Sequence, residues 1–462
     1  MQKILVLGAG RSSPFLIRRL LERSPERDWF VTVGDVDPEL AARRVDGHPR
    51  GTAIRFDVND AGLRATQIEK ADLVINMLAP RFQDLVAWDC LAHGRHMLSA
   101  SYRDSAVRAM EQDAHRQGVL LLCELGLDPG IDHMSAMALI DRLRAEGGRI
   151  RRFCSYGGGL PAPETDPNPL GYVITWNPRN VAMAGENGAQ YMEDGAVRLV
   201  PFHHVFHHTW PVEVEGVGTL EAYPNRDSMP YMESFGLHEV ETMIRGSLRY
   251  PGWSETWAEI VRLGLPNEQL HVPRLGERSY RELLEMFLPR GHDGQRIEER
   301  IARFLGISPT GRILSNLAWL GLFSEEPIGG AATTPAAVLA DLLTRRMPLP
   351  PDGRDVVILQ HELSVEFPHT DRPPERHVST LVTRGEGRST AMARAVGLPT
   401  AIAAELVLAG EIALTGSQIP THSSIYTPVL RELAREGLRF VERMDGTAGG
   451  RDHDRAEDPV TA

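Results

Sequence analysis

The first 130 residues alternate between short apolar runs and longer stretches of helical periodicity. The apolar runs fall at about residues 3 to 7, 29 to 34, 53 to 56, 72 to 77, 95 to 99 and 119 to 123. Between them, apolar residues recur every three or four positions, as in residues 15 to 21 and 85 to 92. Strands that alternate with helices in this way form a parallel sheet covered on both faces. The pattern therefore predicts a doubly wound α/β domain over residues 1–134.

A different pattern begins near Gly147. Apolar and polar residues now alternate with a period of two, as in residues 210 to 217, and proline-rich loops intervene. The alternation returns at residues 356 to 367 and 378 to 383. We expect residues 135–236 and 351–404 to form a second, mixed α/β domain.

Helical periodicity dominates residues 237–350, which predicts a helical insertion. The expected helices lie at residues 237 to 245, 257 to 265, 279 to 287 and 297 to 304, and two more follow at about 388 to 396 and 400 to 409. Helices from about 405–448 are expected to complete the first domain. The charged tail 450–462 is expected to be disordered.

The composition favours small-molecule partners in a reducing compartment. The chain has 42% hydrophobic residues and a net charge of -12, which argues against nucleic acid or anionic membrane surfaces as partners. Cys90, Cys123 and Cys154 are far apart and form no paired framework, and no apolar stretch approaches the roughly 18 residues of a membrane helix. The first apolar run is too short for a signal peptide. A cytoplasmic location is expected.

Only two lysines, Lys3 and Lys70, stand among the 50 basic residues. Lys3 begins the first strand and Lys70 lies at a charged helix end, so neither resembles the desolvated amine that Schiff-base catalysis requires. Covalent catalysis through lysine is therefore not expected.

A glycine turn stands at the first junction between strand and helix. The run that begins at Lys3 ends in Gly8-Ala9-Gly10. Glycines at this point give a tight turn and a close backbone approach, so that the N-terminus of the next helix faces a pyrophosphate. The third glycine of the full fingerprint is missing, but the position favours a Rossmann-type dinucleotide site.

Asp35 ends the second predicted strand, where the adenosine ribose hydroxyls would lie. A carboxylate there binds those hydroxyls and repels a 2'-phosphate, so the sequence favours NAD over NADP. The alternative is that Asp35 caps the following helix.

Several later loops are rich in glycine, proline and charged residues. They are Ser101-Tyr102, Glu124 to His133, Ser155 to Glu164, Asn168 to Tyr172, Tyr223 to Ser228 and Arg245 to Tyr250, with weaker runs at Ala395 to Pro399 and Ile425 to Pro428. In content and order they resemble the saccharopine dehydrogenases that form L-glutamate, also called saccharopine reductases. The resemblance covers nearly the whole chain.

The resemblance implies a homodimer whose substrate lies between the first two domains, and it implies roles for individual residues. Tyr102 and Asp128 would be catalytic, and Ser101, Arg226, Ser247, Leu248 and Arg249 would contact the substrate. Cofactor contacts would come from Gly8, Ala9, Gly10, Arg11, Ser12, Gly34, Asp35, Val36, Asp57, Val58, Ile75, Ala100, Leu127 and Pro129.

Physical reasons support several of these roles independently. Saccharopine carries three carboxylates, and the guanidinium forks of Arg226 and Arg249 match carboxylate geometry. Asp128 precedes a proline and is expected at the carboxyl end of a strand, where ligands bind in open α/β sheets, although a simple turn residue is the alternative. Tyr102 follows the fifth strand and could exchange a proton through its phenol, whereas packing is the commoner role of tyrosine.

Two positions depart from the family pattern. Gly157 stands where many relatives have cysteine, so a thiol is not essential to this site. Val36 stands where relatives that use NADP have an arginine, which again favours NAD. The four histidines within residues 202 to 208 are not expected to bind a metal, because a strand-like segment would point them to both faces.

The sequence predicts an NAD(P)-dependent dehydrogenase of lysine metabolism that acts on the CH-NH group of saccharopine. It would oxidise saccharopine to L-glutamate and 2-aminoadipate 6-semialdehyde, or catalyse the reverse. The alternatives are a related amine or imine dehydrogenase, such as a lysine 6-dehydrogenase or a carboxynorspermidine-type reductase, and a non-catalytic dinucleotide sensor. The sequence leaves open the direction of the reaction in the cell.

Overall fold

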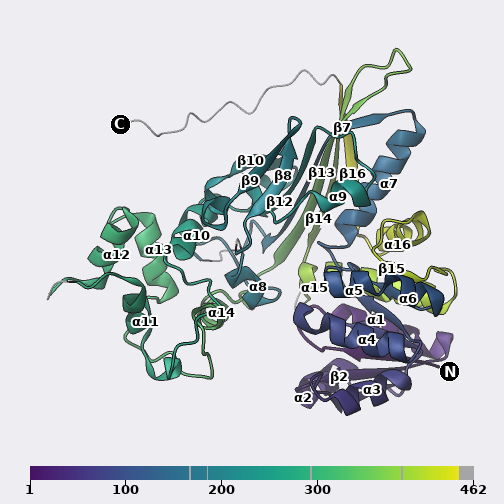
Figure 1. The fold of residues 1–462 in the computed structure, drawn as a ribbon, viewed down its shortest axis with the longest axis horizontal. Helices are drawn as coiled ribbons and strands as arrows, with labels where there is room; N and C mark the ends of the chain where they lie inside the picture. The colour runs from purple at the N-terminus through teal and green to yellow at the C-terminus, as the bar shows by residue number, and fades with distance from the viewer. Residues whose placement is uncertain (166–167, 185, 292–293, 387–388, 447–462) are drawn as a thin grey trace.

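The computed structural model describes residues 1–165, 168–184, 186–291, 294–386 and 389–446. Two β-sheets, each with its own helices, form most of this part of the chain, and a group of helices extends to one side (Figure 1). The α/β class and the presence of a second mixed sheet are confirmed. The predicted disordered tail 450–462 lies outside the described residues.

The first sheet is parallel and has the strand order β15-β6-β5-β4-β1-β2-β3. Its strands are β1 (Gln2–Leu7), β2 (Trp29–Asp35), β3 (Gly51–Arg55), β4 (Leu73–Asn76), β5 (His96–Ser99), β6 (Leu120–Leu122) and β15 (Gly416–Gln418). The central strands are nearly continuous apolar runs because helices cover both faces. β2 and β3 lie on one side of β1, and the chain then crosses to β4 on the other side of β1. This reversal of strand order creates a crevice at the carboxyl ends of β1 and β4.

The helices of the first domain come from both ends of the chain. They are α1 (Pro14–Arg27), α2 (Pro38–Val45), α3 (Ala61–Glu69), α4 (Gln83–Ala92), α5 (Ser105–Ala109), α6 (Glu111–Arg116), α15 (Ala391–Leu408) and α16 (Ser423–Arg435), with the short helix η1 (Pro80–Phe82). The predicted domain boundary at residue 404 falls inside α15, which packs on α1, β4 and β5 of the first domain and also on β13 of the second sheet. The prediction of two separate helices at about 388 to 396 and 400 to 409 was also wrong. Pro399 lies inside one continuous helix, where burial of the surrounding apolar residues outweighs one lost backbone hydrogen bond.

By length and composition, α15 would be able to cross a membrane, which the sequence alone did not indicate. In the fold, 72% of it is buried. It lies against the first sheet and α1, as an apolar core helix does.

The second sheet has the order β10-β11-β12-β7-β13-β14-β16, and β8 and β9 extend it from β12. The strands are β7 (Arg149–Pro161), β8 (Ala189–Glu193), β9 (Ala196–Val200), β10 (Trp210–Val214), β11 (Gly218–Pro224), β12 (Thr242–Arg249), β13 (Asp355–Glu366), β14 (Glu375–Arg384) and β16 (Val441–Gly446). Only β12 and β7 pair in parallel within this described sheet. β16 pairs with β14, so the chain end that was expected to complete the first domain also contributes to the second sheet.

The predicted helix at residues 237–245 was wrong. Residues 242 to 249 form β12, which lies between β11 and β7 in the middle of the second sheet. Seven of its eight residues are buried, and apolar and polar residues do not alternate over Thr242 to Arg245, where the helix was predicted.

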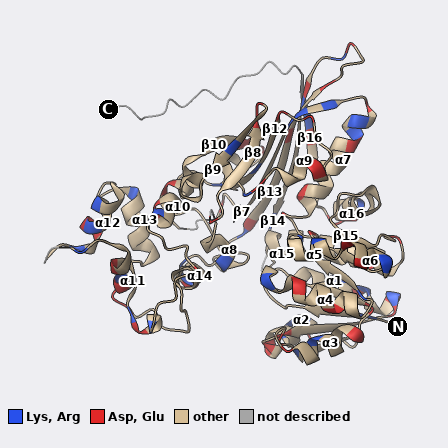
Figure 2. Cartoon of the chain, in the orientation of Figure 1, with Lys and Arg blue, Asp and Glu red and all other residues tan. Residues whose placement is uncertain are grey.

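The helical group therefore begins after β12. It contains α10 (Trp253–Arg262), η3 (Leu275–Glu277), α11 (Tyr280–Phe287), α12 (Ile297–Leu305), α13 (Arg312–Leu320) and α14 (Pro335–Arg346). Basic and acidic positions are interspersed along these helices (Figure 2). The short helices α8 (Pro178–Ala182), η2 (Phe202–His207) and α9 (Pro230–Ser234) lie in the loops of the second domain.

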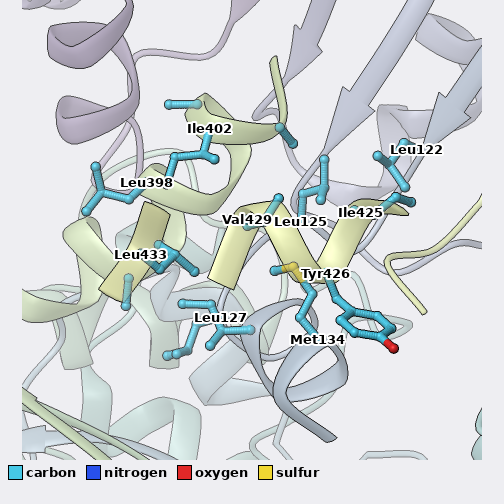
Figure 3. Packing of buried hydrophobic residues seen from close by; sticks show 14 of the residues in the cluster. Leu122, Leu125, Leu127, Met134, Leu398, Ile402, Ile425, Tyr426, Val429 and Leu433 are labelled. Atoms are coloured by element: carbon cyan, nitrogen blue, oxygen red, sulfur yellow. The ribbon is translucent and has the colours of Figure 1, made fainter. Parts of the chain in front are cut away.

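One apolar core connects the two domains (Figure 3). Leu122 ends β6 of the first sheet, Leu125 follows it, and Met134 lies in the first turn of α7 (Ile131–Ala145). Leu398 and Val429 come from α15 and α16. The same cluster continues into residues of β7 and β13. Because this core is continuous, the loop between β6 and α7, which contains Asp128, is held between the two sheets.

Candidate active site

A cavity of about 750 Å³ lies between the carboxyl edge of the first sheet and the second sheet. The first domain contributes the loops that follow β4, β5 and β6. The second domain contributes Gly157 to Gly159 of β7, residues 223 to 226 after β11, and the end of β12. The topology thus brings residues more than 100 positions apart to one site, at the position where doubly wound sheets bind ligands.

Most of the predicted substrate and catalytic residues line this cavity. They are Ser101, Tyr102, Asp128, Arg226, Ser247 and Arg249, and the predicted cofactor residues Ser12, Ala100, Leu127 and Pro129 also line it. Leu248 does not. Its side chain is fully buried against Gly158, because successive residues of a strand point to opposite faces and both of its neighbours face the cavity.

Asp128 and Tyr102 form a pair at the cavity wall. The Tyr102 hydroxyl donates to Oδ1 of Asp128 at 2.9 Å. Burial raises the pKa of Asp128, which the guanidinium of Arg245 opposes, and burial also raises the pKa of Tyr102. The phenol therefore stays protonated near neutral pH, and the pair combines a hydrogen-bond donor with an acceptor at one point of the cavity.

A row of charged side chains lies behind Asp128 and Tyr102. Arg245, on β12, donates to Oδ1 of Asp128 at 2.5 Å and to Oδ2 of Asp132 at 3.4 Å. Asp132 Oδ2 lies 3.1 Å from Nδ1 of His133, whose Nε2 lies 2.8 Å from Glu124. All four of these supporting side chains are buried.

Sequence reasoning missed this row of charged side chains. A signal was present, because Arg245, Ser247 and Arg249 have the period-two spacing that places residues on one face of a strand. The erroneous helix at 237–245 hid it.

The buried His133 makes stability depend on pH. Burial alone would lower its pKa, but the carboxylates of Asp132 and Glu124 outweigh burial and raise the pKa from 6.5 to about 9. The folded protein therefore holds a proton that the unfolded chain releases between these values. We expect the free energy of unfolding to fall by about 3 kcal/mol as the pH rises from 6.5 to 9.

Urea unfolding at several pH values across this range measures the effect. His133→Gln should remove most of the fall in the free energy of unfolding with rising pH, whereas the same change at the exposed His238 should leave that fall in place. An equal slope in both variants would contradict the assignment to His133.

Arg249 is a buried cation within an aromatic enclosure. Its guanidinium lies 4.9 Å from the ring centre of Tyr172, 5.5 Å from Tyr223 and 5.6 Å from Trp253. Its Nη1 donates to the Leu248 carbonyl at 2.7 Å, and its Nε has no hydrogen-bond partner among the described residues. A buried arginine without a carboxylate partner is costly, so this geometry suits an anionic ligand.

Arg226 reaches the same cavity from the turn after β11. It is exposed and adopts a left-handed φ of 55°, and its guanidinium lies 5.6 Å from the ring centre of Tyr102. No ion pair involves Arg226 or Arg249 within the described ranges of the chain. Two guanidinium groups are therefore available to ligand carboxylates in the cavity.

The glycine turn after β1 suits a dinucleotide. Gly8 has φ of 101°, and a Cβ atom there would lie 2.9 Å from the Met77 carbonyl oxygen, so only glycine fits. A Cβ atom at Gly10 would meet nothing within 4 Å, which leaves that backbone open to close approach by a phosphate. Backbone and fold therefore fit the group that the resemblance implied.

The other predicted cofactor residues lie at different places around the Gly8–Gly10 turn. Gly34, Asp35 and Val36 lie at or just after the end of β2, Asp57 and Val58 lie after β3, and Ile75 is buried in β4. Arg11 donates to the Ile174 carbonyl at 2.7 Å, which directs its side chain toward the second domain. Sequence reasoning missed residues 76 to 81 after β4, which line the cavity beside the glycine turn.

The histidine segment is not a strand, as the sequence suggested, but the 3-10 helix η2. A search of the described residues finds no group of three or more His, Cys, Asp or Glu side chains suited to a metal ion.

The sheet order, the glycine turn and the acidic, aromatic and arginine side chains of the cavity define a nicotinamide dinucleotide-dependent dehydrogenase. Residues 4–122 match the family model for the saccharopine dehydrogenase NADP binding domain, and residues 126–438 match the model for the saccharopine dehydrogenase C-terminal domain. The chain belongs to the saccharopine dehydrogenase family.

Individual relatives agree with this assignment. The chain is 33% identical to a saccharopine dehydrogenase [NADP(+), L-glutamate-forming] of Pyricularia oryzae, over 96% of this chain and 99% of that protein. It is 32% identical to the mitochondrial alpha-aminoadipic semialdehyde synthase of Mus musculus, over 95% of this chain but 47% of that longer protein. The solved structure of apo saccharopine dehydrogenase (L-Glu forming) from Saccharomyces cerevisiae superposes with a TM-score of 0.83 at 30% identity, over 96% of this chain and 100% of that one.

Proposed function

We propose that this protein oxidises saccharopine to L-glutamate and 2-aminoadipate 6-semialdehyde, or catalyses the reverse reaction, in lysine metabolism. The observation that carries the proposal is that Arg226 and Arg249, which form no ion pair within the described part of the chain, line the cavity that contains Asp128 and Tyr102. A substrate with several carboxylates around a secondary amine matches that arrangement. The names of the relatives that form L-glutamate support the choice of substrate.

A nicotinamide dinucleotide held at the Gly8–Gly10 turn would supply the acceptor for a hydride from the carbon beside the secondary amine. The neutral amine becomes an imine, a water molecule adds to it, and the carbinolamine splits into an amine and an aldehyde. The arginines fix the substrate carboxylates and hence the position of the reacting carbon. Asp128 and Tyr102 hold the amine and exchange protons with it and with the attacking water.

The test mixes the purified protein with saccharopine and either NAD or NADP, and follows the absorbance of the reduced nicotinamide. Turnover with saccharopine and none with lysine is expected. Turnover of lysine without turnover of saccharopine would favour a lysine 6-dehydrogenase and contradict the proposal. A carboxynorspermidine-type substrate serves as a third comparison.

We further propose that NAD is preferred to NADP, although the matching family model and the fungal relative carry NADP in their names. Oδ2 of Asp35 accepts the Ala9 amide at 2.8 Å, and the N-cap of α2 is Asp37, so Asp35 is not the helix cap. Val36 beside it is exposed and uncharged. The carboxylate therefore lies at the glycine turn, where it would repel a 2'-phosphate.

The cofactor preference is tested by the ratio of kcat/KM with NAD to kcat/KM with NADP. We expect the ratio to exceed one, and Val36→Arg to shift it about tenfold toward NADP through a new phosphate contact. Arg44 is the control, because its guanidinium already donates to the carbonyls of Ala9 and Gly10. A wild-type preference for NADP that Arg44→Ala abolishes would contradict the proposal and assign the 2'-phosphate to Arg44.

We propose a homodimer, as the family resemblance implies. Exposed apolar side chains on β9 and β16, including Val197, Leu199, Val441 and Met444, are consistent with a covered surface. Light scattering coupled to size-exclusion chromatography measures the mass, and a monomer at micromolar concentration would contradict the proposal.

A further inference from the structure

Five buried or partly buried side chains form a line of alternating charge that ends at the cavity. From the interior outward they are Glu124, His133, Asp132, Arg245 and Asp128. The alternation matters because each internal member has an opposite charge on both sides. An arginine as buried as Arg245, at 3% exposure, is stable only with such compensation.

Asp132 and His133, in the interior of the line, both stay charged across the physiological range. Although burial would raise the pKa of Asp132, His133 outweighs burial and lowers it to about 2. The amide of Gly130 also donates to Asp132 at 2.6 Å, and the amide of Arg103 donates to Glu124 at 2.9 Å. Tyr231 covers the guanidinium of Arg245, 4.3 Å from its ring centre. The position of Arg245 is thus fixed on several sides, and it does not depend on a ligand.

The two oxygens of Asp128 have different surroundings. Oδ1 accepts both the Tyr102 hydroxyl and Arg245. Oδ2 faces Gly157, where a Cβ atom would lie only 3.1 Å away, and Gly157 lines the cavity. The absence of a side chain at Gly157 therefore leaves space beside Oδ2 on the cavity side.

We infer that Arg245 is a positioning residue of the active site, which fixes Oδ1 of Asp128 so that Oδ2 faces the substrate amine. This rests on the proposed function, because the amine belongs to the proposed substrate. Arg245 comes from the second domain and Asp128 from the first, so the contact also fixes the two walls of the cavity relative to each other. Small displacements of a reacting group slow catalysis strongly.

The experiment compares Arg245→Gln, Arg245→Lys and a control, Arg19→Gln, with the wild-type protein. Arg19 is a good match because it is also buried and also contacts two carboxylates, Glu405 and Glu436, but it lies on α1 away from the cavity. We expect Arg245→Gln to lower kcat with saccharopine about 100-fold, with a much smaller change in KM. Loss of the guanidinium should also move the acidic limb of the kcat/KM profile to higher pH by about one unit, because it raises the pKa of Asp128.

Asp132, His133 and Tyr102 also face Asp128 and remain in these variants. Arg245→Lys keeps the charge, so its acidic limb should stay in place while kcat falls by less. Arg19→Gln should change neither kcat nor the position of the acidic limb. A rise in KM at unchanged kcat in Arg245→Gln would make Arg245 a substrate ligand, and behaviour equal to that of Arg19→Gln would make it structural. Either result overturns the inference.

A second measurement does not depend on activity. The unfolding midpoints of Arg245→Lys, Asp128→Asn and the double variant should not be additive, because the two side chains are in contact. Strict additivity would overturn the inference even if the glutamine variant does not fold. If the wild-type protein fails to oxidise saccharopine, the proposed function fails, while this cycle still tests the contact.

Discussion

Replacing Arg249 with alanine is expected to raise the KM for saccharopine about 100-fold or more, with a smaller effect on kcat. The guanidinium is buried, surrounded by three aromatic rings, and has an Nε without a hydrogen-bond partner in the described part of the chain. Removing one member of a buried charge pair costs about 2 to 5 kcal/mol of binding free energy. The cost arises because the substrate carboxylate is left without a partner in an enclosure that holds little water. Initial-rate kinetics with saccharopine as the varied substrate measures the change.

The effect should depend on burial. Arg226 is exposed, so Arg226→Ala should raise KM by only about tenfold, as expected of a better solvated ion pair. Arg249→Lys should recover part of the affinity, because lysine keeps the charge but not the planar fork. A KM for Arg249→Ala within a factor of about three of the wild-type value would remove Arg249 from the substrate site.

Replacing Asp128 with asparagine is expected to lower kcat by about 100-fold to 1000-fold, in the range of a lost acid-base group. Asparagine keeps the shape and can still accept the Tyr102 hydrogen bond, but it cannot take up a proton from the amine or the water. The pKa of Asp128 is raised by burial, so protonation removes activity as the pH falls. The acidic limb of the pH profile should therefore vanish in this variant.

Asp104 provides a matched control for Asp128. It lies on the same cavity wall and caps α5 through a hydrogen bond to the Val107 amide at 2.8 Å. Asparagine is also a good N-cap, so Asp104→Asn should fold and retain nearly full activity. If both variants lose activity equally, the role assigned to Asp128 would be contradicted.

Much of the first domain was readable from the chain. The strands near residues 3, 29, 53, 72, 95 and 119 appear close to their predicted positions, because a parallel sheet buried on both faces produces apolar runs separated by helical periodicity. The segments that carry Tyr102 and Asp128 were also identified, since they follow β5 and β6 and are rich in charged and turn-forming residues. The structure nevertheless places Leu125 and Leu127 of the second segment in the apolar core.

Two kinds of feature were missed for physical reasons. β12 lies in the middle of the second sheet and is buried on both faces, so its first half shows no period-two alternation. Residues 237 to 245 were therefore interpreted as helix, and Arg245 to Tyr250 as a loop. α15 contains Pro399 and begins beyond β14, and its packing on α1, β4 and β5 places it against the first sheet. Local patterns contain no information on such long-range packing.

By itself, the sequence determined the doubly wound class, the glycine turn and the polar, turn-rich segment that bears Asp128, because each depends on residue type and local spacing. The tertiary structure alone decided that Leu248 faces away from the cavity and that Arg245 holds Asp128. It also showed that Arg249 has no partner among the described carboxylates. The reason is that burial and charge pairing depend on which residues meet across two sheets, and those residues are separated by more than 100 positions in the chain.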